Sequence, residues 1–153
     1  LLEGVRGSAL IDDSYNSSPV AAAEALRALA DFETMGKKYA VLGDMLELGG
    51  ASEVEHRKVV EHALAVADLV LLVGERFSNS ARSYLNTTSS KVRVFPDARA
   101  AGEALAAELR AGDVALIKGS QGLRMERAVA LALADPSRAP GLLIRQEREW
   151  KNR

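Results

Sequence analysis

Short apolar runs alternate with segments of helical periodicity along most of the chain, and no other feature limits the possible folds as strongly. Runs of four or five residues rich in Val, Ile and Leu occur at 8–11, 39–42, 69–73, 92–95 and 114–117. Continuous runs of this length are typical of strands buried on both faces of a parallel sheet. The sequence therefore predicts an α/β fold, a Rossmann-like doubly wound and mostly parallel sheet of five or six strands with helices on both faces.

The segments between these runs carry the signals of helix starts. Ser18 precedes Pro19, the order expected of an N-cap residue and a proline in the first turn. Asp97 can cap a helix in the same way, and Ser52 with Glu55 fits a capping box. Helices are accordingly expected within residues 18–36, 52–64, 77–85, 97–109 and 123–133.

The chain of 153 residues is expected to form one domain. We divide it into a main body, residues 1–140, and a C-terminal strand and tail of the same domain, residues 141–153. Residues 141–145 are apolar enough to form one more strand at an edge of the sheet, and the charged remainder holds the only tryptophan. The first residue is not methionine, which suggests a fragment of a longer protein.

Composition excludes several classes of function. Twenty basic and 21 acidic residues leave a net charge of −1, so no nonspecific nucleic-acid surface is expected. Cysteine is absent, which excludes disulfides and thiolate chemistry. His56 and His62 fall on opposite faces of one predicted helix, so no metal site is expected. No apolar stretch reaches the roughly 18 residues of a membrane span and no signal peptide opens the chain, which predicts a cytoplasmic protein.

Acidic and amide side chains follow the first apolar run. In open α/β sheets, ligands bind outside the carboxyl ends of the strands. Asp13, Tyr15 and Asn16 are therefore candidates for a polar ligand, with carboxylates that could accept hydrogen bonds from ribose hydroxyls. The alternative is an ordinary turn into the next helix, because Asp, Ser and Asn are also common turn and capping residues.

The fifth run ends in the opposite charge. Lys118 could hold an anionic group, Ser120 could donate or accept a hydrogen bond, and Gly119 would let the backbone approach a ligand closely. The helix expected next would present its N-terminus, which favours anions. The alternative is a strand end whose lysine merely extends to solvent.

The second run leads into an unusual loop. Asp44 stands at the strand end and is followed by the apolar pair Met45 and Leu46. An apolar pair in a loop is expected to pack on a ligand, on a neighbouring domain, or back on its own core. These three possibilities are equally open from the sequence.

Three common signatures of ligand or substrate sites are absent from the sequence. There is no G-x-x-x-x-G-K-[ST] phosphate loop, no G-x-G-x-x-G after a run, and no G-x-S-x-G nucleophile turn. The chain therefore lacks a nucleotide-phosphate cradle of its own.

Taken together and in order, three sequences resemble the C-terminal domain of the Mur ligases. They are DDSYNSSP at 12–19, VLGDMLELGG at 41–50 (followed by Ser52 and His56), and GDVALIKGSQGLRME at 112–126. The resemblance covers almost all of residues 1–135. The first two sequences are similar to those of the branch that adds D-alanyl-D-alanine to UDP-N-acetylmuramoyl-tripeptide.

Two positions depart from the family pattern. Ser17 and Ser18 stand where the family commonly has Ala-Asn, and Gln121 stands where it commonly has arginine. Arg124 comes three residues later. It could replace that arginine only if the start of the following helix is displaced.

The resemblance implies an ATP-dependent carboxylate–amine ligase of peptidoglycan precursor synthesis. ATP would phosphorylate the tripeptide carboxylate, and the dipeptide amine would then displace phosphate. ATP and Mg²⁺ would be bound mainly by the central domain, and the present domain would close over them. The partners would be UDP-N-acetylmuramoyl-tripeptide, D-alanyl-D-alanine and the N-terminal and central domains, with no nucleic acid and no membrane.

Particular residues acquire expected roles from this resemblance. The candidate catalytic residue is Lys118; the nucleotide-binding candidates are Asp13, Tyr15 and Asn16; the substrate-binding candidates are Asp44, Met45, Leu46, Ser120 and Arg124; no metal ligand is expected in this chain.

Three other readings stay open. A sister ligase domain with another amine substrate would share the fold and most of the motifs. A noncatalytic binding module could also use the same fold. A phosphoacceptor receiver domain is disfavoured, because it needs Asp after the third run and Ser or Thr after the fourth, where Gly74 and Pro96 stand.

Overall fold

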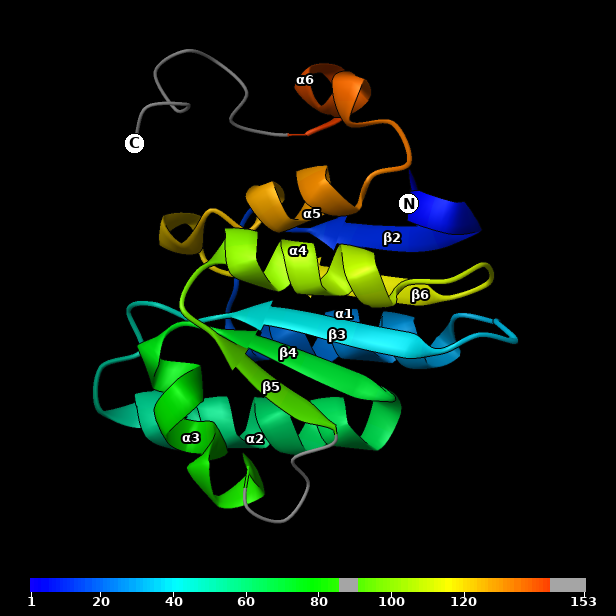
Figure 1. Ribbon diagram of the computed structural model, residues 1–153. Helices are drawn as coiled ribbons and strands as arrows, with labels where there is room; N and C mark the ends of the chain where they lie inside the picture. Colours follow the sequence, from blue (N-terminus) through cyan, green and yellow to red (C-terminus); the bar gives the residue numbers. More distant parts are fainter. Residues whose placement is uncertain (86–90, 144–153) are drawn as a thin grey trace.

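The computed structural model describes residues 1–85 and 91–143, and its centre is a six-stranded sheet (Figure 1). The strands lie in the order β1-β2-β6-β3-β4-β5, and every neighbouring pair is parallel except the antiparallel pair β1 and β2. The strands are β1 (Leu2–Gly4), β2 (Ser8–Asp13), β3 (Lys38–Gly43), β4 (Leu69–Val73), β5 (Val92–Phe95) and β6 (Val114–Lys118). The predicted α/β fold with a mostly parallel sheet is confirmed.

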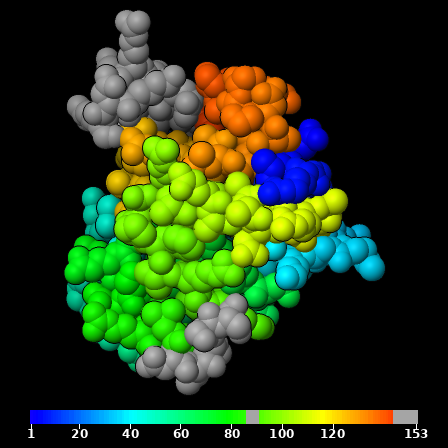
Figure 2. Space-filling model, viewed as in Figure 1, coloured from blue at the N-terminus to red at the C-terminus, as the bar shows by residue number. Residues whose placement is uncertain are grey.

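Helices cover both faces of this sheet. They are α1 (Pro19–Asp31), α2 (Ser52–Val66), α3 (Glu75–Leu85), α4 (Ala98–Glu108), α5 (Glu126–Ala132) and α6 (Ala139–Leu142). The helices α1, α2 and α3 bury their apolar residues against one face, and α4 and α5 bury theirs against the other. Figure 2 shows α4 lying across the middle of the second face. In the part of the chain that the structure describes, no helix is both long and apolar enough to cross a bilayer.

Two of the three predicted helix caps are present. The Ser18 hydroxyl accepts a hydrogen bond from the Ala21 N–H at 3.2 Å, and the Asp97 carboxylate accepts one from the Ala100 N–H at 2.9 Å. The capping box at Ser52 is wrong. A 3₁₀ turn, Gly49–Ala51, runs directly into α2, so the residue before the helix is itself helical and makes no side-chain cap.

The extra edge strand expected over residues 141–145 is also wrong where the structure describes it. Residues 139–142 form the short helix α6, and residues 144–153, with the tryptophan, lie outside the described residues. Pro140 lies in the first turn of α6, and a short apolar run cannot by itself distinguish a strand from a helix. The sixth strand is instead β1, where Leu2 pairs with Leu10 of β2.

The register of the sheet brings three strand ends together. Lys118 at the end of β6 is paired with Asp13 of β2 on one side and with Leu42 of β3 on the other. The loops that follow β2, β3 and β6 therefore leave the sheet side by side. These are the three loops whose sequences carry the candidate site residues.

Candidate functional site

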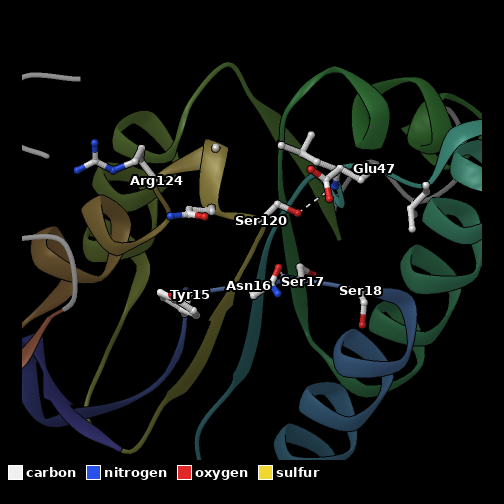
Figure 3. Close-up of a pocket in the computed structure, with 11 residues that line it drawn as sticks. Tyr15, Asn16, Ser17, Ser18, Glu47, Ser120 and Arg124 are labelled. Carbon is white, nitrogen blue, oxygen red and sulfur yellow. Dashed lines mark hydrogen bonds between the residues drawn. The ribbon is translucent and has the colours of Figure 1, made fainter.

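A pocket of about 880 Å³ lies between the loops after β2, β3 and β6 (Figure 3). Its walls are Tyr15, Asn16, Ser17, Ser18, Leu46, Glu47, Leu48, Ser120, Gln121, Gly122 and Arg124. It opens at the carboxyl ends of the strands, the usual ligand position in such sheets. The three loops singled out from the sequence thus form one site.

The loop after β2 is both a tight turn and a wall of the pocket. The Ser14 N–H donates to the Asp12 carboxylate at 3.1 Å, and the Ser17 N–H donates to the Asn16 side-chain oxygen at 2.8 Å. These bonds fix the turn that leads into α1. Tyr15 remains 61% exposed, so its ring is accessible to a ligand. The loop can therefore be both an ordinary turn into α1 and part of a ligand site.

Lys118 ties this loop to the centre of the sheet. Its side chain is only 2% exposed, and its ammonium donates to the Asp13 carboxylate at 2.7 Å and to the Asn16 carbonyl at 2.8 Å. The structure thus brings three of the predicted site residues together. Lys118 does not itself line the pocket. Its ammonium group is instead bound inside the protein by the Asp13 carboxylate.

Asp44 holds the start of α3. Its two carboxylate oxygens accept hydrogen bonds from the Arg76 N–H at 3.0 Å and the Phe77 N–H at 2.8 Å. The preceding glycine, Gly74, has a φ of 109°, and a Cβ there would stand 2.4 Å from the Asp44 carboxyl carbon. Asp44 can therefore cap α3 only because residue 74 has no side chain.

The apolar pair after Asp44 divides between core and pocket. Met45 is fully buried in the core that α1, α2 and α3 share with the sheet, whereas Leu46 lines the pocket. Packing back on the core is therefore realised by Met45, and Leu46 is placed where a ligand could contact it. Asp44 and Met45 support the loop and do not line the pocket.

Three successive backbone amides of this loop are bound by three different elements. The Asp44 N–H donates to the Val73 carbonyl of β4 at 3.0 Å, and the Met45 N–H donates to Nε2 of His56 in α2 at 3.0 Å. The Leu46 N–H donates to the Ser120 hydroxyl after β6 at 2.9 Å. The loop conformation is consequently fixed from three sides.

His56 is a buried structural residue, whereas the sequence indicated only that it was not part of a metal site. Its ring is fully buried, and Nδ1 lies 2.7 Å from the Ser52 carbonyl, so Nδ1 carries the proton and Nε2 accepts from Met45. Burial lowers the pKa of His56, and the nearby Arg76 acts in the same direction. Its spacing with Val59, Val60 and Ala63 on the buried face of α2 is the sequence signal that identifies it.

The loop after β6 departs from expectation at Gly119 and agrees with it at Ser120. A Cβ at Gly119 would stand 2.5 Å from the Met125 side chain and 3.1 Å from the Gly43 Cα. The glycine therefore makes room for the protein's own methionine and strand, not for a ligand. Ser120 does line the pocket, and its hydroxyl accepts from the Leu46 N–H.

Arg124 lines the pocket because the start of α5 is displaced. The helix expected from residue 123 begins at Glu126, after a 3₁₀ turn (Gln121–Leu123), and Arg124 has a left-handed φ of 54°. Its guanidinium pairs with the carboxylate of Glu126, which is 1% exposed. In Figure 3 the guanidinium points away from Ser120 and Asn16. The start of α5 is therefore displaced, but the guanidinium of Arg124 is bound to Glu126 and is not directed at Ser120 or Asn16 (Figure 3).

Metal ligands are sparse around this pocket. Within residues 1–85 and 91–143, no three His, Asp or Glu side chains lie close enough together to hold a metal ion. The residues described therefore do not fit a magnesium site contained within this chain.

The chain belongs to the Mur ligase family. The family described as "Mur ligase, glutamate ligase domain" matches residues 1–121. Among curated relatives, the UDP-N-acetylmuramoyl-tripeptide–D-alanyl-D-alanine ligase of Treponema pallidum is 37% identical over 118 residues, which are 75% of this chain and 25% of that protein. The ligase of the same name from Bacillus subtilis is 29% identical over 141 residues, 89% of this chain and 30% of that protein.

Solved structures give the same family. The MurF ligase of Thermotoga maritima in complex with ADP superposes with a TM-score of 0.69 at 30% identity, covering 91% of this chain and 30% of that one. A MurF structure from Acinetobacter baumannii has a TM-score of 0.69 at 28% identity and covers 82% of this chain and 28% of that one. The chain therefore spans between a quarter and a third of the length of these relatives.

Proposed function

We propose that this chain is the C-terminal domain of an ATP-dependent ligase that adds D-alanyl-D-alanine to UDP-N-acetylmuramoyl-tripeptide in peptidoglycan precursor synthesis. One observation carries the proposal: the three sequences that resemble that ligase branch converge on a single pocket at the carboxyl ends of β2, β6 and β3. The names of the curated relatives support the same substrates.

The loop after β2 is the proposed nucleotide side of the pocket. Asp13, Tyr15 and Asn16 would contact ATP: Tyr15 and Asn16 line the pocket, and the half-exposed Asp13 carboxylate, which is bound to Lys118, lies outside its lining. A relative solved in complex with ADP supports a nucleotide in this family. The phosphates and Mg²⁺ would be held mainly by a central domain, since this chain has neither a phosphate loop nor a cluster of metal ligands in its described part.

The loops after β3 and β6 are the proposed side of the incoming dipeptide. Leu46, Ser120 and Arg124 line the pocket there and would contact it. We propose that Lys118 serves as a positioning residue that holds Asp13 and Asn16 in place. Asp44 and Met45 would act by fixing the loop that carries Leu46.

The proposed chemistry requires a site that excludes water. The γ-phosphoryl group of ATP is transferred to the tripeptide carboxylate. The dipeptide amine then attacks the acyl carbon and phosphate leaves. An acyl phosphate hydrolyses in water, so closure of this domain over the central domain would protect it. Residues 1–140 would form the closing body, residues 141–153 its C-terminal tail, and the enzyme would act in the cytoplasm.

Assay of the full-length ligase tests this proposal. ADP release should require UDP-N-acetylmuramoyl-tripeptide and D-alanyl-D-alanine together. ADP release with a different amine, and not with this dipeptide, would assign the chain to a sister ligase. No ADP release with any amine, from a folded enzyme, would favour a noncatalytic binding module.

A further inference from the structure

The pocket wall contains a single carboxylate, that of Glu47. The residue lies in the loop after β3, between Leu46 and Leu48, which also line the pocket. Within residues 1–85 and 91–143, the Glu47 carboxylate takes part in no hydrogen bond or ion pair. Most carboxylates of the neighbouring α2 behave differently, since Glu53 and Glu55 pair with Arg57 and Lys58.

The backbone of Glu47 is held in an unfavourable conformation. Its φ is 66°, in the left-handed region where the Cβ of an L-residue is crowded. In the described chain three non-glycine residues have a positive φ, and two of them, Glu47 and Arg124, line this pocket. Such strain persists where the surrounding structure enforces it, and it concentrates at ligand sites.

The surroundings of Glu47 do enforce its position. The three bonded amides of residues 44–46 fix the chain directly before it. Leu46 reaches across to the loop after β6, where its methyl group lies 3.0 Å from the Cβ position of Gly122. In Figure 3, as drawn, Glu47 and Ser120 lie above Tyr15 and Asn16. Glu47 thus presents a carboxylate from a fixed backbone, and its two neighbours in the chain, Leu46 and Leu48, are apolar.

We infer that Glu47 binds the ammonium group of the incoming amine substrate. This inference rests on the proposed ligase function, in which that substrate is a small aliphatic dipeptide. An α-amino group is largely protonated at neutral pH. An ionised carboxylate is purely an acceptor and forms strong, short bonds with such a cation. Leu46 and Leu48 would pack against the methyl side chains, which gives the pocket one charged contact and an apolar wall.

A magnesium ion is the other cation that the Glu47 carboxylate could bind in an ATP-dependent ligase. Mg²⁺ is commonly held by one or two carboxylates with waters and substrate phosphates, whereas the side chains next to Glu47 are apolar and suit the methyl groups of the dipeptide. The ammonium group is therefore the better match.

The test uses the full-length ligase with Glu47→Gln, Glu47→Asp and Glu47→Gly. We expect Glu47→Gln to raise KM for D-alanyl-D-alanine about tenfold or more, because a charge-assisted bond is lost. KM for ATP and for the UDP-linked tripeptide should stay within about twofold. Glu47→Asp should recover part of the loss. Glu47→Gly should raise the amine KM without lowering the melting temperature, since glycine relieves the left-handed backbone.

The matched control is Glu53→Gln, on the exposed surface of α2 and outside the pocket, which should leave all three KM values unchanged. If the wild-type enzyme does not ligate, the proposed function itself fails. If it does ligate and Glu47→Gln leaves the amine KM unchanged, the inference about Glu47 is overturned. A changed Mg²⁺ requirement with an unchanged amine KM would overturn it equally and assign the carboxylate to the metal.

Discussion

The ion pair between Lys118 and Asp13 joins one buried and one half-exposed side chain. Lys118 is 2% exposed, whereas the Asp13 side chain is 45% exposed. Removing Lys118 therefore leaves a half-exposed carboxylate without its partner, whereas removing Asp13 leaves a buried ammonium group without its partner. A carboxylate left at Asp13 can be hydrated, but an ammonium left at Lys118 stays buried and still donates to the Asn16 carbonyl. Leaving a buried charge without its partner is the costlier outcome.

We predict that Asp13→Ala destabilises the domain more than Lys118→Met, although Asp13 is the more exposed residue. The expected losses in the free energy of unfolding are about 3 kcal/mol and about 1 kcal/mol. Urea unfolding of the two variants and of the wild type measures both values. A larger loss for Lys118→Met would contradict the prediction, because methionine keeps the apolar stem and removes only the ammonium contacts to Asp13 and Asn16.

His56 makes the stability of the domain depend on pH. Because burial lowers its pKa, the unfolded chain binds a proton below the ordinary value of 6.5 while the folded chain resists it. Stability is thus fully present above pH 6.5 and should fall as the pH decreases from there. The slope contributed by this one group is at most about 1.4 kcal/mol per pH unit.

The variant His56→Gln removes this titration. Its free energy of unfolding should be lower than that of the wild type at pH 8 and should change less between pH 7.5 and 5.5. Asp44, 4.0 Å from Nε2, and Arg76 are present in both proteins, so they do not produce the difference. Equal slopes for the two proteins would mean that His56 is not the group responsible.

At the scale of single residues, the residue types of the site were predictable from the sequence. Which of them line the pocket and which support the loops was not. Asp, Ser and Lys at strand ends suit a ligand and a turn equally well. What separates Asp44, which caps α3, from Leu46, which lines the pocket, is the position of α3 relative to the loop. That position depends on tertiary packing, which local sequence does not encode.

The loop after β3 and the helix α3 form one unit at the scale of elements. Asp44 caps the helix, and Gly74 gives it the room to do so. His56 adds α2 to the unit through Met45. The pocket wall therefore depends on elements that do not themselves line it.

We predict that Gly74→Ala destabilises the domain by about 2–3 kcal/mol, because alanine is strained at a φ of 109° and its Cβ would displace the Asp44 carboxylate. Gly50→Ala is the matched control. Residue 50 has open space around it and no positive φ, so its variant should stay within about 0.5 kcal/mol of the wild type. Thermal unfolding of both variants and of the wild type measures the two effects. If Gly74→Ala melted at the same temperature as Gly50→Ala, the absence of a side chain at residue 74 would not be needed for the cap of α3.

The elements themselves were largely predictable, because the central strands β3, β4 and β6 are buried on both faces and each long helix has a periodic apolar side. The errors fell where these signals are weak. The capping box at Ser52 was overridden by a 3₁₀ turn, and the apolar run near residue 141 became the short helix α6. The antiparallel strand β1 was missed because three residues carry too little periodicity.

For the molecule as a whole, folding and chemistry have different requirements. Two apolar cores, one on each face of the sheet, bury the central strands β3, β4 and β6 almost completely. Both cores are formed by residues of this chain. The proposed ligase chemistry calls for a further domain, which would hold the phosphates and the metal ion.

We therefore predict that the purified 153-residue chain folds cooperatively and does not ligate. Circular dichroism should show one unfolding transition, coincident when followed by helix signal and by tyrosine environment. ADP release from ATP should stay at background with UDP-N-acetylmuramoyl-tripeptide and D-alanyl-D-alanine both present. It should appear when the domain is joined to its central domain, because closure of the two would then assemble the phosphates and the amine in one dry site. Turnover by the isolated chain would mean that the pocket between β2, β3 and β6 holds the whole reaction, and the division of labour proposed for the two domains would have to be abandoned.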